Sequence, residues 1–195
     1  MRSRVNRSGT RTSLEMRTTV LFIAAAALSA VPLGATTLIP ADVSELSRDA
    51  RAIVLGRVAA IEARWTADRR SIETLVTLEA DTYLKGALGP SVQFLVPGGE
   101  LGRFQNIVVG APRFTAGERV IVFLGARGPS IPFVLGLNQG LFRVVLDNSV
   151  WVVTPPAFLP AGGASVPIVR GDPRRRPMAL DEFARQIRAL AEARP

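Results

Sequence analysis

The chain contains no cysteine and no histidine among its 195 residues. These two absences exclude Ser-His-Asp and Cys-His catalysis, zinc sites built from thiolates or imidazoles, and a histidine pH switch. Disulfides are excluded as well, so the folded chain depends on packing alone. The sequence therefore predicts no catalytic residue, no metal-binding residue and no cofactor.

Lysine is almost absent too, because Lys85 is the single lysine and the other 23 basic residues are arginine. Codon bias explains this skew more simply than phosphate recognition does. The formal net charge is +8, but residues 1–35 hold five arginines and one glutamate, which leaves 19 basic against 15 acidic residues beyond them. That balance is ordinary for a folded domain and gives weak grounds for binding nucleic acid, so no nucleic-acid partner is expected.

An apolar run from Val20 to Val31 follows a basic segment, and the small residue Ala35 lies shortly after it. A basic region, an apolar run of about a dozen residues and a small residue at the end are typical of a secretory signal peptide. We predict a signal peptide over residues 1–35, with Met16 as an alternative start of translation. The mature protein is then exported, periplasmic or extracellular, with no stable membrane span.

The alternative is a membrane anchor formed by an uncleaved segment over residues 17–39. Such an anchor needs roughly 20 apolar residues to span the hydrocarbon. Pro32, Gly34 and Thr36 interrupt the run before it reaches that length, which favours cleavage. Cleavage after Ala35 puts a leucine at the minus-three position, where alanine is preferred, so the exact site stays open.

About 160 residues remain beyond residue 35, which suits one domain. Asp42 with Glu45 three positions later forms a capping-box pattern and predicts a short helix. Two long strands are predicted over Ala52–Trp65 and Ile72–Leu84, paired as a hairpin through the polar turn Ala67–Arg70. Gly56 within the first strand predicts a bulge or a bend.

Six shorter apolar runs follow, each bounded by Gly, Pro or Asn, and we predict that all are strands: Val92–Val96, Phe104–Val109, Glu118–Leu124, Phe133–Leu137, Leu141–Leu146 and Val150–Val153. Regular short strands of this kind indicate a barrel or a sandwich. We predict a β domain over residues 36–154, a Pro/Gly/Arg-rich loop over 155–177 and a C-terminal helix over 178–195 packed on the barrel. One face of that helix carries apolar side chains, namely Leu180, Phe183, Ile187, Leu190 and Ala191.

Three motifs, Arg51–Val58, Tyr83–Gly86 and Gly117–Phe123, occur in an order that resembles netrin-like domains over residues 42–146. These are the OB-like barrels of the tissue inhibitors of metalloproteinases and of complement C-terminal modules. The chain also resembles uncharacterised exported bacterial proteins with the same Lys-Gly and Gly-Glu-Arg marks. The resemblance implies a mainly β fold, an OB-like (netrin-like) β-barrel with a short N-terminal helix and a C-terminal helix. The zinc-chelating mechanism of those inhibitors needs an N-terminal cysteine, so the resemblance does not carry that mechanism to this chain.

Some polar motifs permit a functional or a structural interpretation. Lys85, preceded by Asp81 and Tyr83, offers groups for proton transfer, but a polar strand end is the simpler interpretation. Glu118 and Arg119 would begin a strand and point to opposite faces. A structural turn with a surface ion pair elsewhere is favoured over a site at that position.

Other motifs are weaker still as sites. Pro97–Gly102 is rich in glycine but lacks the helix that a phosphate cradle needs, so it predicts a flexible turn or a contact surface. Arg174–Arg176 could contact anionic lipid or polysaccharide or be a proteolysis site, although a solvated loop is favoured. Trp65 and Trp151 are interpreted as core or barrel-rim residues rather than ligand platforms. None of the serines considered, Ser91, Ser130 and Ser165, lies in a Gly-x-Ser-x-Gly context.

These observations favour an exported, non-enzymatic binding or inhibitory module. Its expected contact regions are the loops Ala67–Arg70, Gly98–Arg103 and Pro155–Pro177, because loops on a rigid scaffold commonly carry recognition. The partner would be an exported protease or another envelope protein. One alternative is an OB-type barrel that binds polyanions or polysaccharides, and a lesser one is a hydrolase that uses carboxylates alone.

Overall fold

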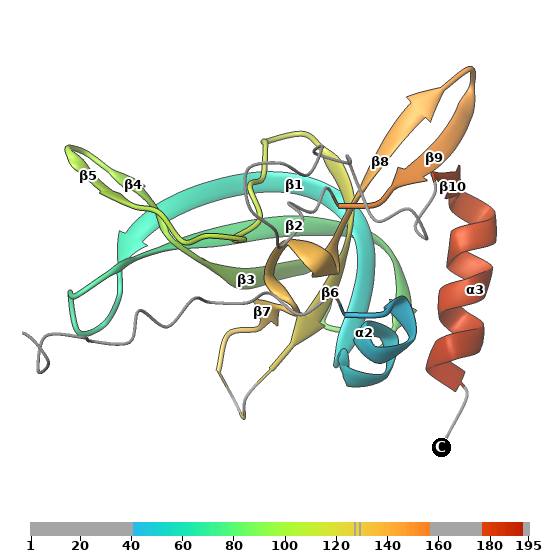
Figure 1. Cartoon of the computed structure of the whole chain (residues 1–195), viewed down its shortest axis with the longest axis horizontal. Helices are drawn as coiled ribbons and strands as arrows, with labels where there is room; N and C mark the ends of the chain where they lie inside the picture. Colours follow the sequence, from blue (N-terminus) through green and yellow to red (C-terminus); the bar gives the residue numbers. More distant parts are fainter. Residues whose placement is uncertain (1–40, 127, 129, 157–176, 193–195) are drawn as a thin grey trace, which may run out of the picture. The chain divides into compact units, whose positions relative to one another are not determined.

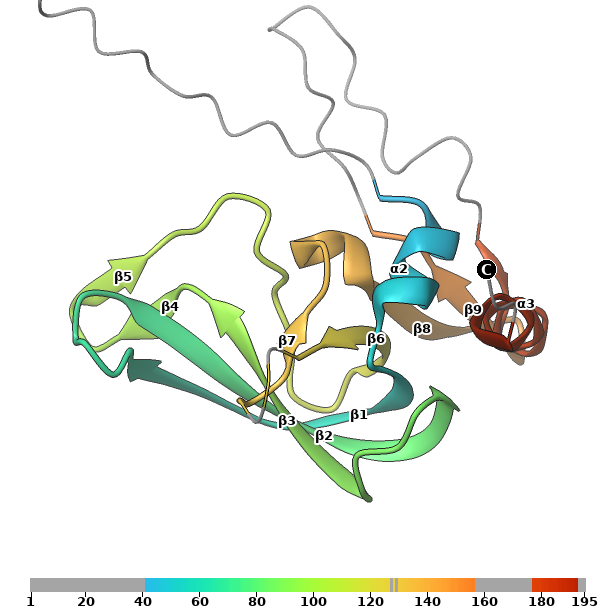
Figure 2. The same ribbon diagram turned by 90° about the horizontal axis from the view of Figure 1, so that it is seen from below.

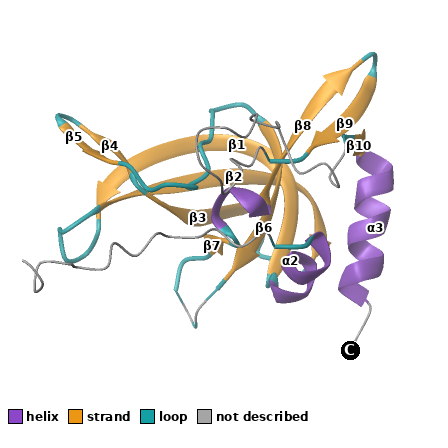
Figure 3. Cartoon of the chain, viewed as in Figure 1, coloured by secondary structure: helices purple, strands orange, loops and turns teal. Residues whose placement is uncertain are grey.

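The computed structural model describes residues 41–126, 128, 130–156 and 177–192, which form a mainly β structure with two α-helices (Figures 1 and 3). The segments predicted as signal peptide or anchor, Ser165, Arg174–Arg176 and most of the 155–177 loop lie outside the described residues. Within the described part of the chain, no helix has the length and apolar character needed to cross a membrane.

Eight strands form one mixed sheet in the order β1-β2-β3-β7-β6-β8-β9-β10. Their bounds are β1 (Ala52–Trp65), β2 (Ile72–Lys85), β3 (Ser91–Pro97), β6 (Arg119–Gly125), β7 (Phe133–Val134), β8 (Leu141–Asp147), β9 (Val150–Thr154) and β10 (Met178–Ala179). A separate two-stranded hairpin consists of β4 (Gly99–Leu101) and β5 (Phe104–Asn106). The remaining elements are α2 (Val43–Asp49), the 3-10 helix η1 (Leu137–Gly140) and α3 (Leu180–Glu192).

The sheet curls into a partial ring because β1 also pairs with β6 (Figure 2). Strands β1, β2, β3, β7 and β6 are thus linked in turn, and the last pairs with the first. The link between β3 and β7 is the shortest, a parallel pairing at Leu95 and Phe133. The mainly β class with a short N-terminal helix and a C-terminal helix agrees with the sequence prediction.

The long hairpin of β1 and β2 has the predicted extent and is antiparallel throughout. Its register shifts between Leu55 and Gly56, which confirms the bulge expected at that glycine. A Cβ atom at Gly56 would lie 2.2 Å from the carbonyl oxygen of Glu79 on β2. Only glycine lets the two backbones approach this closely.

Two buried clusters lie on opposite faces of β1 and β6, which explains the uninterrupted apolar runs in these strands. Ile53 and Phe123 belong to one cluster, which also contains side chains of both helices. Val54 and Val122 belong to the other, which lies among β2, β3 and β7. A strand covered on both faces leaves little room for polar residues, whereas no residue of β1 beyond Val58 is buried.

Helix α2 has the predicted capping box, in which the Asp42 N–H donates a 3.2 Å hydrogen bond to Glu45 Oε2. The C-terminal end of this helix is bound by a side chain that is remote in the sequence. The Lys85 ammonium, at the end of β2, donates hydrogen bonds to the carbonyl oxygens of Ser47 (2.7 Å) and Arg48 (2.9 Å). A cation at a helix C-terminus satisfies carbonyls that have no partner within the helix.

Helix α3 begins at Leu180, so the prediction that it starts at residue 178 is wrong. Met178 and Ala179 pair with β9 as the short strand β10. The helix buries Phe183, Ala184 and Ile187, and the rings of Phe142 and Phe183 lie 5.0 Å apart. Its contacts therefore attach it to the sheet, as the apolar face indicated.

Two predicted strands are too long. The run Phe104–Val109 is a strand only to Asn106, because the chain then turns and the Ala111 N–H donates to the Val108 carbonyl at 3.1 Å. The run Phe133–Leu137 is a strand only to Val134. Leu137 has φ of +55°, a left-handed conformation that cannot continue a strand and that begins η1.

The contact between Lys85 and α2 yields a stability prediction. Replacing this lysine, Lys85→Met, removes both hydrogen bonds to the helix and should lower the free energy of unfolding by about 1–2 kcal/mol. Urea denaturation measures the change. The control is Arg57→Met, at an exposed position of β1 whose side chain makes no polar contact among the described residues, and equal losses in the two variants would contradict the stabilising role of Lys85.

Candidate functional site

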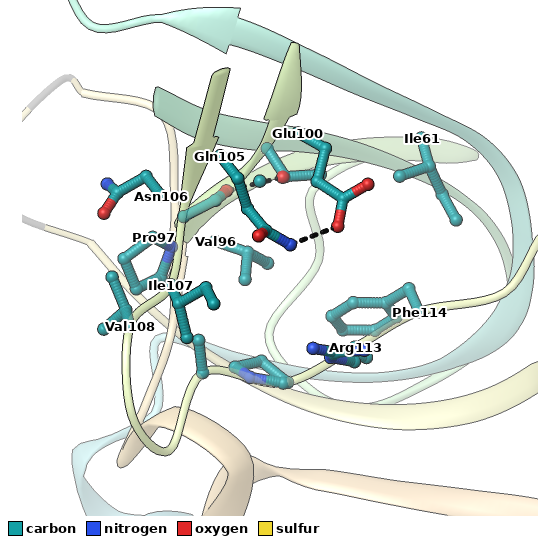
Figure 4. Close-up of a pocket in the computed structure, with 15 residues that line it drawn as sticks. Ile61, Val96, Pro97, Glu100, Gln105, Asn106, Ile107, Val108, Arg113 and Phe114 are labelled. Atoms are coloured by element: carbon teal, nitrogen blue, oxygen red, sulfur yellow. Dashed lines mark hydrogen bonds between the residues drawn. The ribbon is translucent and has the colours of Figure 1, made fainter. Parts of the chain in front are cut away.

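A pocket of about 410 Å³ lies where the β4–β5 hairpin meets the segment 107–114 (Figure 4). We call it the hairpin pocket. Its lining residues come from the three strands β1, β2 and β3, the hairpin and that segment: Ile61, Thr74, Val96, Pro97, Gly98, Gly99, Glu100, Gln105, Asn106, Ile107, Val108, Ala111, Pro112, Arg113 and Phe114. The views of the whole fold place the hairpin at the end of the β1–β2 ribbon away from α3 (Figures 1 and 2).

The hairpin wall is held against β2 by backbone and side-chain hydrogen bonds. The Gly98 N–H donates to the Ile72 carbonyl (3.0 Å), and the Thr74 hydroxyl donates to the Gly98 carbonyl (2.7 Å). A Cβ atom at Gly99 would lie 2.6 Å from Thr74 Oγ1, so this glycine allows the close approach. The loop predicted over Gly98–Arg103 therefore contains β4, which corrects that part of the sequence prediction.

The opposite wall, segment 107–114, has no regular strand or helix but is anchored at several points. The Asn138 N–H of η1 donates to the Gly110 carbonyl at 2.9 Å. The Arg143 guanidinium donates to the Arg113 carbonyl at 2.8 Å. The Phe114 ring packs edge-on against Phe94 of the core, with centroids 5.3 Å apart.

Charged groups of opposite sign face each other across the hairpin pocket (Figure 4). On the hairpin side, the Gln105 amide donates a short hydrogen bond to the Glu100 carboxylate. On the facing side, Arg113 is exposed and forms no ion pair within the described residues. The pocket therefore offers a hydrogen-bond acceptor at one side and a free cation at the other.

Large apolar side chains remain exposed at this pocket. Ile61 is 38% exposed and Ile107 is 69% exposed, and both line it. The neighbouring Val109 is 83% exposed. Exposed apolar groups gathered around a concave site commonly mark a surface that is covered in a complex.

The groups around Lys85 do not form a proton-transfer site, because each has a separate partner. Lys85 bonds to α2, the Asp81 carboxylate pairs with Arg119 at 2.9 Å, and the Tyr83 hydroxyl donates to the Gly89 carbonyl at 2.7 Å. The structural interpretation of Lys85 is favoured by these contacts.

Glu118 and Arg119 diverge at the start of β6, as predicted. Glu118 pairs with Arg143 at 3.3 Å and accepts a 2.8 Å hydrogen bond from the Thr115 N–H. Arg119 pairs with Asp81 on the other side. Glu118 and Arg119 therefore form ion pairs themselves, whereas the sequence predicted a surface ion pair elsewhere.

The tryptophans are not core residues, since Trp65 is 38% and Trp151 is 40% exposed. Trp65 contacts the edge of the Phe104 ring, with centroids 5.4 Å apart, and the Arg103 guanidinium lies over that ring. Trp151 lies under the guanidinium of Arg119, 4.7 Å from the ring centroid. Of the two predicted positions, core or barrel rim, the core is therefore excluded for both rings.

The remaining candidate residues form no site in the described part of the chain. Ser91 is the exposed first residue of β3, and Ser130 is exposed after β6. Among the described residues, no group of three or more carboxylates could hold a metal ion.

The turn Ala67–Arg70, a predicted contact loop, is organised around Asp68. The Thr66 hydroxyl donates to Asp68 Oδ1 at 2.6 Å and the Arg70 N–H donates to it at 3.2 Å. These bonds favour the ionised carboxyl and hold the pKa of Asp68 below its usual value. The resulting stabilisation of the turn is present above the ordinary pKa of aspartate and is lost as the pH falls through the lowered value.

Sequence reasoning missed most of the hairpin pocket. The apolar run Ile107–Val109 is apparent in the sequence, but its apolar character predicts a strand and not an exposed segment beside a pocket. Its proximity to Ile61 and Arg113 depends on the folding of three separate segments. No family model, curated protein or solved structure matches this chain.

The Thr66–Asp68 hydrogen bond can be tested directly. The variant Thr66→Val removes the hydroxyl donor, so the pKa of Asp68 should rise toward the usual value of about 3.9. Nuclear magnetic resonance of the Asp68 carboxyl during an acid titration measures this midpoint. Thr82→Val, whose lost hydroxyl donates only to the Asp81 carbonyl, should leave it unchanged, and an unaltered midpoint in Thr66→Val would refute the assigned cause.

Proposed function

We propose that this chain is an exported, non-enzymatic binding module and that its hairpin pocket holds an apolar peptide segment of a partner protein. The observation that carries the proposal is the exposure of Ile61 and Ile107 at the rim of a concave site. Covering apolar surface is favourable by about 25 cal/mol per Å², from which the entropy lost on association is subtracted. An exported protease or another envelope protein is the proposed partner.

The volume and the lining of the pocket suit a short, extended peptide segment. Its volume of about 410 Å³ lies in the range of roughly 300–1,000 Å³ typical of ligand sites. The oxygens of Glu100 can accept hydrogen bonds from peptide N–H groups, and the apolar walls can cover side chains. This combination suits a peptide better than a highly hydroxylated ligand.

We further propose that the partial ring is an OB-like barrel of the netrin-like type. Its support is the double pairing of β1, with β2 along one edge and β6 along the other. An OB-fold is a five-stranded, partly open barrel, and the linked strands β1, β2, β3, β7 and β6 agree with that number. The fold by itself does not determine the ligand.

A carboxylate-based hydrolase receives less support from the hairpin pocket. Glycosidases of this type commonly need two carboxyl groups at the reacting bond. Among the described residues that line the pocket, only Glu100 carries one.

A second candidate function, the binding of polysaccharides or other polyanions, is favoured by a different surface. Trp65, Phe104 and Arg103 form an exposed cluster of two rings and a guanidinium. Rings beside a cation can stack on sugars or contact anionic groups. Binding of that type should fall steeply with added salt, whereas apolar peptide binding should not.

Export is testable with a reporter enzyme, alkaline phosphatase, fused after residue 195 and active only outside a reducing cytoplasm. The full chain should give active reporter in a bacterial host. Replacing Ala24 and Ala25 by arginine should abolish the activity, because charges interrupt the apolar run that export requires. The control, Ala67→Arg in the β1–β2 turn, should retain activity, and an active Ala24→Arg, Ala25→Arg fusion would contradict the signal-peptide proposal.

Partner binding is testable by retention from envelope and extracellular fractions, with the full chain as bait at low and high salt. A protein retained at high salt by the unaltered chain should be lost, or weakened at least about tenfold, in Ile107→Ser, since the variant removes exposed apolar surface at the pocket. Val145→Ser, also at an exposed position but on β8, is the matched control. Equal retention by both variants would exclude the hairpin pocket as the binding site.

A further inference from the structure

We infer that the hairpin pocket binds the C-terminal end of a peptide and that Arg113 holds the terminal carboxylate. This inference rests on the proposed function, because it names which part of the peptide enters the pocket. Arg113 lines the pocket wall that faces Glu100 and Gln105 (Figure 4).

Arg113 forms no ion pair among the described residues, a property that it shares with other arginines such as Arg103. The ion pairs that the described part of the chain forms involve other arginines: Arg64 with Glu73 (2.9 Å), Arg119 with Asp81 (2.9 Å) and Arg143 with Glu118 (3.3 Å). What distinguishes Arg113 is its position, because it is the one cationic residue among the described residues that line the pocket. A ligand carboxylate can therefore pair with it without displacing an existing partner.

The backbone below this guanidinium is anchored. Arg143 donates to the Arg113 carbonyl at 2.8 Å, and the same Arg143 pairs with Glu118, which accepts from the Thr115 N–H. Pro112 on its other side is buried. Because the backbone of Arg113 is fixed, less conformational entropy is lost when its guanidinium binds a ligand.

The surroundings of Arg113 favour a carboxylate attached to an apolar group. Phe114 and Ile107 line the pocket beside it, and a guanidinium can hold a carboxylate through two parallel hydrogen bonds. Covering Ile107 with the last side chain of the peptide would also exclude water from the ion pair, which strengthens it.

The facing wall gives the bound peptide a direction. The Glu100 carboxylate is engaged by the Gln105 amide and keeps acceptor capacity for a peptide N–H. A terminal carboxylate placed there would be repelled by the like charge. The terminal carboxylate of the peptide therefore binds Arg113, and the amide groups that precede it lie toward Glu100.

The test uses two pools of fluorescent hexapeptides with apolar residues at the last two positions, one with a free C-terminal carboxylate and one amidated. Fluorescence anisotropy with the full chain measures binding. The free-acid pool should bind about tenfold more tightly or better, and the preference should disappear in Arg113→Gln. Arg103→Gln, which alters a guanidinium outside the pocket lining, should keep the preference.

The outcomes separate this inference from the proposed function. Equal binding of both pools by the unaltered chain, or a preference that persists in Arg113→Gln, would overturn the carboxylate assignment and leave the peptide proposal standing. Binding of neither pool would overturn both. Octanoate that displaces the free-acid pool at peptide-like concentration would show that a fatty acid is the carboxylate source, against a peptide terminus. An unfolding midpoint for Arg113→Gln equal to that of the unaltered chain ensures that a lost preference reflects the guanidinium.

Discussion

The structure depends on strand β1, which pairs along both edges and is covered on both faces over its first half. It pairs with β2 from Ile53 to Trp65 and with β6 from Ala52 to Arg57. Alternate side chains then enter the two buried clusters. A strand that is paired along both edges and covered on both faces tolerates few substitutions by polar or larger residues. Gly56 is the position at which the backbone of β2 approaches β1 most closely.

The second half of β1 extends beyond the part that pairs with β6 and is buried on both faces. There β1 and β2 form a ribbon on which β3 and the β4–β5 hairpin are mounted. The hydrogen bonds from Thr74 and to Ile72 fix that hairpin to the ribbon. The β4–β5 hairpin contributes no residue to the two buried clusters, and the pocket side chains Ile61 and Ile107 stay exposed.

Several charged residues are engaged in ion pairs or in helix capping and are therefore not free to bind a ligand. Lys85 holds the end of α2, and arginines 64, 119 and 143 each pair with a carboxylate. These contacts explain why several polar motifs that are suggestive in sequence do not form a chemical site. Arg113 is left available in the pocket because the carboxylates near it in sequence are engaged elsewhere or lie across the cavity.

Local patterns in the sequence determined the helix cap at Asp42 and Glu45, the extent of β1, the bulge at Gly56 and the apolar face of α3. Each of these depends on neighbouring residues or on burial repeated at a fixed period, which a sequence displays directly.

Only the tertiary structure decided where the shorter strands end and how the hairpin pocket is assembled. Met178 lies in a strand because β9 is beside it, and the strand after Phe104 stops because a turn follows Asn106. The pocket joins Ile61 to Arg113 and other residues distant in the sequence. Strand pairing, left-handed backbone positions and the pocket arise from contacts between segments that are remote in the sequence. The periodicity of apolar residues indicates local structure but not which segments come into contact.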